Sequence, residues 1–238
     1  MNCQGTSVSH ETGVLLWAKA LYHKLEGCAI PLNYFALTID LDKKIILTDR
    51  DTYCYSTLYN SIPIPELPNL IKASDEEYGT FCNAAKKLHW TSGYLVSLGL
   101  KGDIPREELW EYVYDEDVII SRLYSPSLMS EFSAPKGCYS IQAEIYIRDG
   151  RQMAKEDEIL KEAIRQLDKI GVISKDDIIV RDIRFVKYCN VIFDHEIYRN
   201  RELVDDYLKQ KEVISIGRFG KWDYLWSDQS FVSGYNAV

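Results

Sequence analysis

The sequence lacks the usual marks of proteins that are cross-linked, embedded in membranes or bound to nucleic acids. Its six cysteines are scattered among 238 residues without a C-x-x-C pair, so we expect neither a disulfide framework nor a zinc site. No stretch approaches the roughly 20 apolar residues that span a bilayer, and no secretory signal is visible, which predicts a cytoplasmic protein without a membrane span. The 36 acidic residues outnumber the 28 basic ones, which argues against a nucleic-acid partner.

Common catalytic and nucleotide-binding motifs are also missing. The chain contains no G-x-G-x-x-G, no G-x-x-x-x-G-K-[ST], no H-E-x-x-H and no G-x-S-x-G. The four histidines are far apart, and His195, although carboxylates flank it, is more typical of a solvated strand end than of a general base. We therefore predict no catalytic side chain and no metal site.

The composition that remains is that of an ordinary globular protein, with 46% hydrophobic and 27% charged residues. Hydrophobic periodicity predicts helices over residues 12–26, 65–71, 154–170, 201–209 and from 227 or 228 almost to the end. It predicts strands over residues 30–40, 45–48, 53–61, 86–100, 117–124, 138–148, 178–193 and 213–216. Strands interrupted by several helices, without regular alternation, favour an α+β fold around a mixed or antiparallel sheet.

The segment that follows the last predicted strand carries a glycine-rich turn with one arginine. Gly217 and Gly220 have no side chain, so they let the backbone approach a ligand closely. Arg218 lies between them and is a fixed cation that can bind a phosphate through two hydrogen bonds. The turn therefore has residue types suited to an anionic ligand.

An aromatic cluster and a helix start come next. Trp222, Tyr224 and Trp226 offer flat faces for a ring system. Ser227 or Asp228 can cap the last helix, whose free backbone N–H groups attract negative charge. The same pattern also fits a simple strand–turn–helix in which the aromatic residues are core.

This segment resembles the C-terminal flavin signature of the FAD-dependent amine oxidase and protoporphyrinogen oxidase superfamily. Within that group it is most similar to UDP-galactopyranose mutase and its relatives. The residues that match the signature are, in order, Gly217, Arg218, Gly220, Trp222, Tyr224 and Asp228. Trp222 stands where the mutases carry the first tyrosine of a pair, while the later spacing is kept.

Three other stretches resemble the same family. Residues 55–67 are similar to its strand and Thr/Ser-x-Pro-Leu-Pro-x-Leu turn, residues 32–40 to a Leu-Asn…Ile-Asp strand, and residues 135–144 to a strand of the substrate domain. The family's dinucleotide-binding glycine fingerprint has no counterpart, so the chain resembles the second part of a flavoprotein. We expect a fragment, a split product or a degenerate paralogue that lacks the N-terminal half.

The resemblance implies a division of the chain into three parts. Residues 1–60 would be a helix and strands of the returning FAD domain, residues 61–195 a sheet domain of the substrate type, and residues 196–238 the flavin-contacting strand and helix.

The resemblance also implies FAD as the cofactor and names its contacts. Gly217 and Arg218 would lie beside the flavin and its phosphates, or beside a substrate diphosphate. Trp222 and Tyr224 would flank the ring system or a sugar-nucleotide phosphate. The remaining contacts would be Ser227, Asp228, Gln229 and Ser230 at the helix start, and Ser61 and Pro63 from another strand.

Three functions follow as alternatives. The first is an incomplete FAD-dependent mutase or oxidoreductase of sugar-nucleotide or cell-surface polysaccharide biosynthesis, with a sugar nucleotide or another small molecule as substrate. In such a mutase the reduced flavin is the nucleophile, and in an oxidase the flavin accepts a hydride. The second is a non-catalytic, truncated paralogue that binds the missing half or a second copy through an exposed apolar surface. The third is an unrelated α+β ligand-binding domain.

Overall fold

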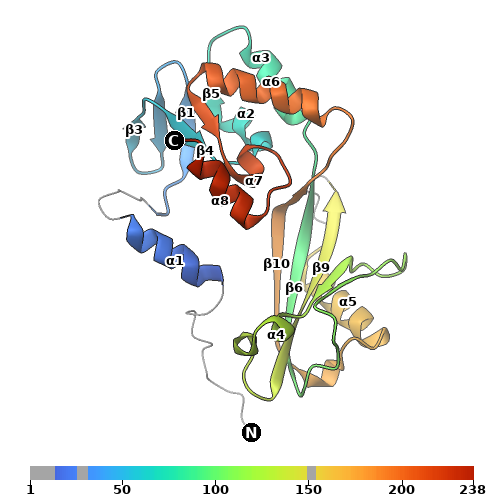
Figure 1. Cartoon of the computed structure of the whole chain (residues 1–238). Coiled ribbons are helices and arrows are strands. Elements are labelled where there is room, and N and C mark those ends of the chain that lie inside the picture. Colours follow the sequence, from blue (N-terminus) through green and yellow to red (C-terminus); the bar gives the residue numbers. More distant parts are fainter. Residues whose placement is uncertain (1–13, 26–31, 149–153) are drawn as a thin grey trace. The chain divides into compact units, whose positions relative to one another are not determined.

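The computed structural model describes residues 14–25, 32–148 and 154–238. The chain divides into two compact units (Figure 1). The sheet unit consists of residues 1–29 and 92–189, and the C-terminal unit consists of residues 30–91 and 190–238.

The sheet unit is built on five strands in the order β10-β6-β9-β8-β7. The strands are β6 (Trp90–Lys101), β7 (Trp110–Tyr112), β8 (Arg122–Tyr124), β9 (Cys138–Arg148) and β10 (Ile178–Val191). Its helical segments are α1 (Val14–Lys24), α4 (Pro126–Met129), η2 (Glu131–Ser133), α5 (Glu156–Lys169) and η3 (Lys175–Asp177). Strands β7, β8 and β9 are antiparallel neighbours. The strand predicted over 138–148 and the helix predicted over 154–170 are confirmed.

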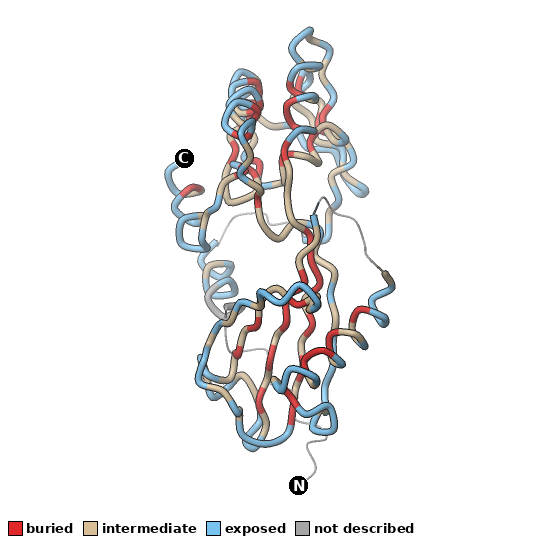
Figure 2. The backbone as a smooth tube through the Cα atoms, turned by 90° about the vertical axis from the view of Figure 1, so that its right-hand side faces the viewer, coloured by how far each residue is buried: buried red, intermediate tan, exposed pale blue. Residues whose placement is uncertain are grey.

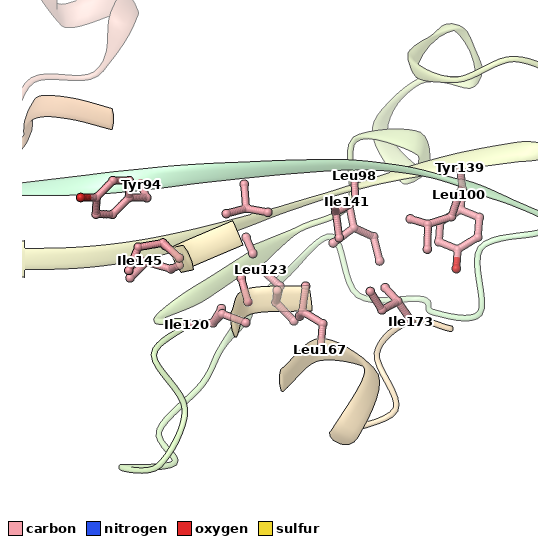
Figure 3. Packing of buried hydrophobic residues seen from close by; sticks show 14 residues of the cluster. Tyr94, Leu98, Leu100, Ile120, Leu123, Tyr139, Ile141, Ile145, Leu167 and Ile173 are labelled. Atoms are coloured by element: carbon pink, nitrogen blue, oxygen red, sulfur yellow. The ribbon is translucent and has the colours of Figure 1, made fainter. Parts of the chain in front are cut away.

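Strand β6 and helix α5 supply much of the core of the sheet unit. Alternate residues of β6, from Tyr94 to Leu100, are at most 2% exposed, as the period of two in the sequence predicts. Leu167 of α5 lies in the same cluster, which Figure 3 shows from close by. Because burial of one such side chain stabilises the fold by about 1.5–3 kcal/mol, this cluster fixes α5 to the sheet.

The C-terminal unit contains two sheets. One is four-stranded in the order β3-β2-β1-β5, and the other pairs β11 with β4 in parallel. The strands are β1 (Ala36–Asp40), β2 (Ile45–Thr48), β3 (Thr52–Cys54), β4 (Leu58–Asn60), β5 (Ile71–Lys72) and β11 (Val213–Ser215). The helical segments are η1 (Ile64–Glu66), α2 (Leu67–Leu70), α3 (Tyr78–Lys86), α6 (Ile197–Gln210), α7 (Gly217–Gly220) and α8 (Ser227–Tyr235).

The predicted α+β class is confirmed, with mixed and antiparallel sheets. Two strand predictions needed correction. Residues 53–61 form two short strands, β3 and β4, that belong to different sheets, and only 122–124 of the strand predicted over 117–124 is a strand. Within the ranges that the structure describes, no helix is both long and apolar enough to cross a membrane.

An ion pair ties the start of α3 to the end of α6. The Lys211 Nζ lies 2.8 Å from Asp75 Oδ2, and the Tyr207 hydroxyl donates to the same oxygen over 3.1 Å. Lys211, by its hydrogen bond, lowers the pKa of Asp75 below the usual value of 3.8. The folded chain therefore favours the ionised carboxylate.

We expect Asp75→Asn to lower the free energy of unfolding by up to about 1 kcal/mol at neutral pH. Because the pKa of Asp75 is lower in the folded than in the unfolded chain, its contribution is complete above about pH 5 and is lost as the pH falls through the folded-state pKa. Urea unfolding at pH 7 and pH 3 measures this difference. The neighbouring exposed carboxylate is the control: Glu76→Gln should leave the free energy of unfolding at pH 7 unchanged, and equal effects of the two variants would contradict the prediction.

Candidate functional site

The parallel pair β4 and β11 brings two predicted groups of site residues to one edge. The pairing of Ser215 with Asn60 and the 2.9 Å bond from the Ile216 N–H to the Asn60 oxygen put both carboxyl ends side by side. Ser61 follows β4 and Gly217 follows β11. The carboxyl ends of parallel strands are where α/β sheets commonly bind ligands, so this edge is the candidate site.

The two glycines of the turn have different uses. Gly217 has a φ of +70°, which favours glycine, and its N–H donates to the Ser233 Oγ of α8 over 2.7 Å. At Gly220 a Cβ atom would lie 2.4 Å from the backbone oxygen of Asn60. The sequence predicted close approach to a ligand, whereas the close approach at Gly220 is to the backbone that ends β4.

Arg218 is held in place by three neighbours. Its Nη2 donates to the Asn190 Oδ1 over 2.8 Å, and its Nη1 lies 3.5 Å from the Leu225 backbone oxygen. The guanidinium lies over the Tyr224 ring, with its Cζ 4.5 Å from the ring centroid. The buried Arg218 Nε has no hydrogen-bond partner among the described residues. One donor of a fixed cation is therefore buried without a partner among the described residues.

Asn190 contacts the candidate site through Arg218, and the sequence did not single it out. It lies near the end of β10, 28 residues before Arg218 in the chain. No local motif marks it, because its role depends on where β10 ends in the folded unit. Only the tertiary structure could reveal this contact.

The two predicted aromatic contacts differ sharply in exposure. Trp222 is 0% exposed and its ring centroid lies 6.3 Å from those of both Trp90 and Phe219, so its ring packs inside the unit. This corrects the expectation that Trp222 presents an open face to a ligand. Tyr224 is 49% exposed, so one of its faces can meet a ring system while Arg218 covers the other.

The last helix begins at Ser227, as predicted, but its cap differs. The N-cap residue is Trp226, and its N–H donates to the Gln229 Oε1 over 2.9 Å. The predicted side-chain cap from Ser227 or Asp228 is therefore wrong. Both of these side chains and Gln229 are exposed, and Ser230 is half-buried. Figure 2 shows that most of this helix, which leads to the marked C-terminus, is exposed.

A polar cavity of about 510 Å³ lies beside the turn, between α6 and the segment from β11 to Asp223. Arg201 and Asp223 form an ion pair of 3.1 Å at its wall. None of the ten predicted site residues lines the cavity; its lining residues are Ile64, Tyr198, Arg201, Glu202, Asp205, Asp206, Lys209, Ser215, Gly220, Lys221 and Asp223.

The sheet unit has a polar network that the sequence analysis did not single out. Arg122 donates to both carboxylate oxygens of Glu144, over 2.8 and 2.9 Å, and its guanidinium also lies 5.2 Å from the Trp110 ring centroid. Trp110 stacks on Tyr124 at 4.4 Å. The alternation of polar and apolar residues along β9 could have indicated this polar face.

His195 is exposed, and the described residues contain no group of three His, Cys, Asp or Glu side chains placed to hold a metal ion. The arrangement at the turn is suited to holding an anionic ligand with an aromatic ring, through Arg218, Tyr224 and the first turn of α8.

The structure has relatives among solved proteins. No family model matches the chain, and no curated protein sequence matches it. A structure of reduced UDP-galactopyranose mutase superposes with a TM-score of 0.84 at 21% identity, over 92% of this chain and 49% of that one. An Exiguobacterium sp. 255-15 protein assigned as a protoporphyrinogen oxidase superposes with a TM-score of 0.72 at 16% sequence identity, over 87% of this chain and 46% of that one. A CLA-producing fatty acid isomerase from P. acnes superposes with a TM-score of 0.61 at 15% sequence identity, over 88% of this chain and 49% of that one.

These matches confirm the resemblance inferred from the sequence at the level of the fold. This chain spans about half the length of the structures that it matches. It therefore has the fold of one part of UDP-galactopyranose mutase, protoporphyrinogen oxidase and related flavoproteins.

Proposed function

We propose that this chain forms one wall of an FAD site in an enzyme related to UDP-galactopyranose mutase, in sugar-nucleotide or cell-surface polysaccharide biosynthesis. The observation that carries the proposal is the setting of Arg218: a fixed guanidinium, with a buried unpartnered Nε, lies against Tyr224 and beside the start of α8. The fold shared with part of the mutase supports the same function.

The described residues fit a flavin nucleotide by their chemistry. The Arg218 Nε is a spare donor for a phosphate or a ring oxygen, and Tyr224 has an exposed ring face. The first turn of α8, from Ser227 to Gln229, has backbone N–H groups beyond the reach of intrahelical bonds. Bound FAD would supply the nucleophilic or hydride-accepting chemistry, while these residues would bind and orient it.

Arg218→Ala tests this site. We expect FAD, titrated into the whole chain and followed by flavin fluorescence, to bind about 10- to 150-fold more weakly to the variant, because a charge-assisted hydrogen bond contributes about 1.5–3 kcal/mol. Arg218→Lys should recover part of the affinity, since it restores the charge without the planar fork.

The matched control is Arg165→Ala, which removes an exposed arginine from α5 in the other unit. It should leave FAD affinity unchanged. If Arg218→Ala binds FAD as tightly as the unmodified chain does, Arg218 is not part of the site. If the unmodified chain does not bind FAD at all, the proposal fails for this chain by itself.

A second candidate function is a non-catalytic binding module, and the exposed apolar side chains around α8 favour it. Trp226 is 67% exposed, Phe231 54% and Tyr235 77%. Such a surface is typical of a contact with another polypeptide. A chain that remains colourless with added FAD, yet self-associates or binds a partner, would support this function over the first.

A further inference from the structure

The sheet unit contains a pocket that the proposed FAD site does not use. The pocket has a volume of about 290 Å³ and lies on β6, β9 and β10 beside residues 133–135. These three strands are neighbours in the order β10-β6-β9 (Figure 1). All of the lining residues belong to the sheet unit, so one compact unit forms the whole pocket. Its volume is at the lower end of the range of about 300–1,000 Å³ that is usual for ligand pockets.

Small residues on two neighbouring strands create the hollow. Ser97 and Gly99 of β6 and Ser140 of β9 line the pocket, and each leaves space that a larger side chain would fill. A Cβ atom at Gly99 would lie 3.1 Å from the Val180 Cβ, so the hollow is already narrow at this point. The sheet itself is therefore the floor of the pocket.

The rest of the lining is mainly aliphatic. Its aliphatic residues are Leu98, Ala134, Pro135, Ile179 and Val180. Ile179 is 38% exposed and Val180 59%, although both side chains are branched hydrocarbons. An apolar ligand in the pocket would remove this surface from water, which favours binding.

Two hydroxyl groups of the lining already have hydrogen-bond partners within the protein. The Ser97 Oγ accepts from the Gln142 Nε2 over 3.2 Å, and the Ser140 Oγ lies 3.1 Å from the Ser127 Oγ. A ligand group that lies beside them needs no polar atoms to satisfy them. The interior therefore favours a saturated chain over a polar group.

The charge of the lining selects the head group of such a ligand. Among the described residues that line the pocket, Asp182 alone is charged. The Arg184 Nε donates to its Oδ2 over 3.0 Å, and the Asp182 side chain is 48% exposed. A carboxylate repels an anionic head and accepts hydrogen bonds from hydroxyl groups. A neutral head with hydroxyl groups therefore fits better than the carboxylate of a fatty acid.

We propose that this pocket binds the aliphatic chain of a neutral amphiphile whose head carries hydroxyl groups, of the alkyl glycoside class. An apolar cavity of about 150 Å³ holds one benzene ring, so this pocket has room for about ten carbon atoms of a chain. The inference goes beyond the proposed function, because the pocket and Arg218 belong to different units and no flavin is needed.

A series of alkyl glucosides of increasing chain length tests the proposal. Each is titrated into the whole chain by calorimetry, below its micelle concentration and without FAD. We expect the affinity to rise about fourfold for each added methylene group, and to stop rising near about ten carbons, when the pocket is full. Octanoate should bind about tenfold or more weakly than octyl glucoside because its head is anionic.

Ala134→Phe is the matching variant, because the added ring fills the pocket from its wall. We expect it to bind octyl glucoside about tenfold or more weakly than the unmodified chain. The control is Ala237→Phe, the same substitution at a half-buried alanine of the C-terminal unit, which should leave binding unchanged. The chain-length series on the unmodified chain still decides the question if Ala134→Phe does not fold.

Four results would overturn the proposal. One is the absence of binding across the series. Another is an affinity that keeps rising with chain length, which indicates adsorption to an open surface. The third is octanoate binding as tightly as octyl glucoside. The fourth is equal binding by Ala134→Phe and Ala237→Phe, which would place the glycoside elsewhere on the chain.

Discussion

Gly220→Ala is expected to destabilise the C-terminal unit by about 3 kcal/mol or more, the upper part of the range for overpacking of a rigid contact. The added Cβ would lie 2.4 Å from the Asn60 oxygen and 3.0 Å from the Ser61 Cα. All of the nearest atoms belong to the backbone, so no side chain can rotate to make room. Urea unfolding followed by tryptophan fluorescence measures the loss, because Trp222 and Trp90 report on this unit.

Gly234→Ala is the matched control for this prediction. Gly234 lies in α8 and has no atom within 4 Å of an added Cβ. Alanine should therefore stabilise the helix by up to about 1 kcal/mol. Wild-type stability of Gly220→Ala would show that β4 and α7 can separate without cost.

The contact at Gly220 matters for function because it holds the two halves of the candidate site together. Ser61 and Pro63 follow β4, while Gly217 and Arg218 begin α7. If the backbone of α7 moves away from β4, these groups no longer share one edge. We therefore expect Gly220→Ala to lose FAD affinity together with stability.

Local sequence patterns predicted most of the helices and strands in which hydrophobic residues recur with a clear period. Strand β9 has the predicted bounds, and β6 buries the alternate residues that the sequence indicates. Helix α5 (Glu156–Lys169) likewise lies within the predicted range of 154–170. These elements are determined by a period of two or 3.6, which the sequence shows directly.

The strand predicted over 53–61 failed because its division depends on distant partners. The run has tyrosines at positions 53, 55 and 59 and contains neither glycine nor proline, so no strong breaker residue marks the division. In the structure β3 pairs with β2, whereas β4 pairs with β11, more than 150 residues later in the chain. Pairing at that distance cannot be read from local propensity.

The position of the site stays a prediction, and the structure tests only which of the predicted residues come together and how exposed they are. The glycines and Arg218 stand out by residue type, and the topology gathers them with Ser61. The exposure of each aromatic ring, the cap at Trp226 and the contact with Asn190 depend on tertiary packing. Residue type therefore indicated the segment that we propose as the site and left open which face of each ring is available.

Trp222→Ala is expected to cost about 3–5 kcal/mol of unfolding free energy, as for other fully buried aromatic residues. The indole is 0% exposed and packs edge-on against Trp90 and near Phe219. Trp222→Phe should cost less, because it keeps an aromatic ring in the same place. Urea unfolding measures both.

Tyr224→Ala provides the contrast, since its ring is 49% exposed. Its stability should stay within about 0.5 kcal/mol of the unmodified chain, while FAD binding weakens because Arg218 loses the ring against which its guanidinium lies. The two aromatic residues then have different roles: Trp222 contributes to the free energy of unfolding, and Tyr224 contributes to the affinity for FAD. If Trp222→Ala kept full stability and lost only FAD binding, the indole would be a ligand contact, and the packing role assigned to it would be wrong.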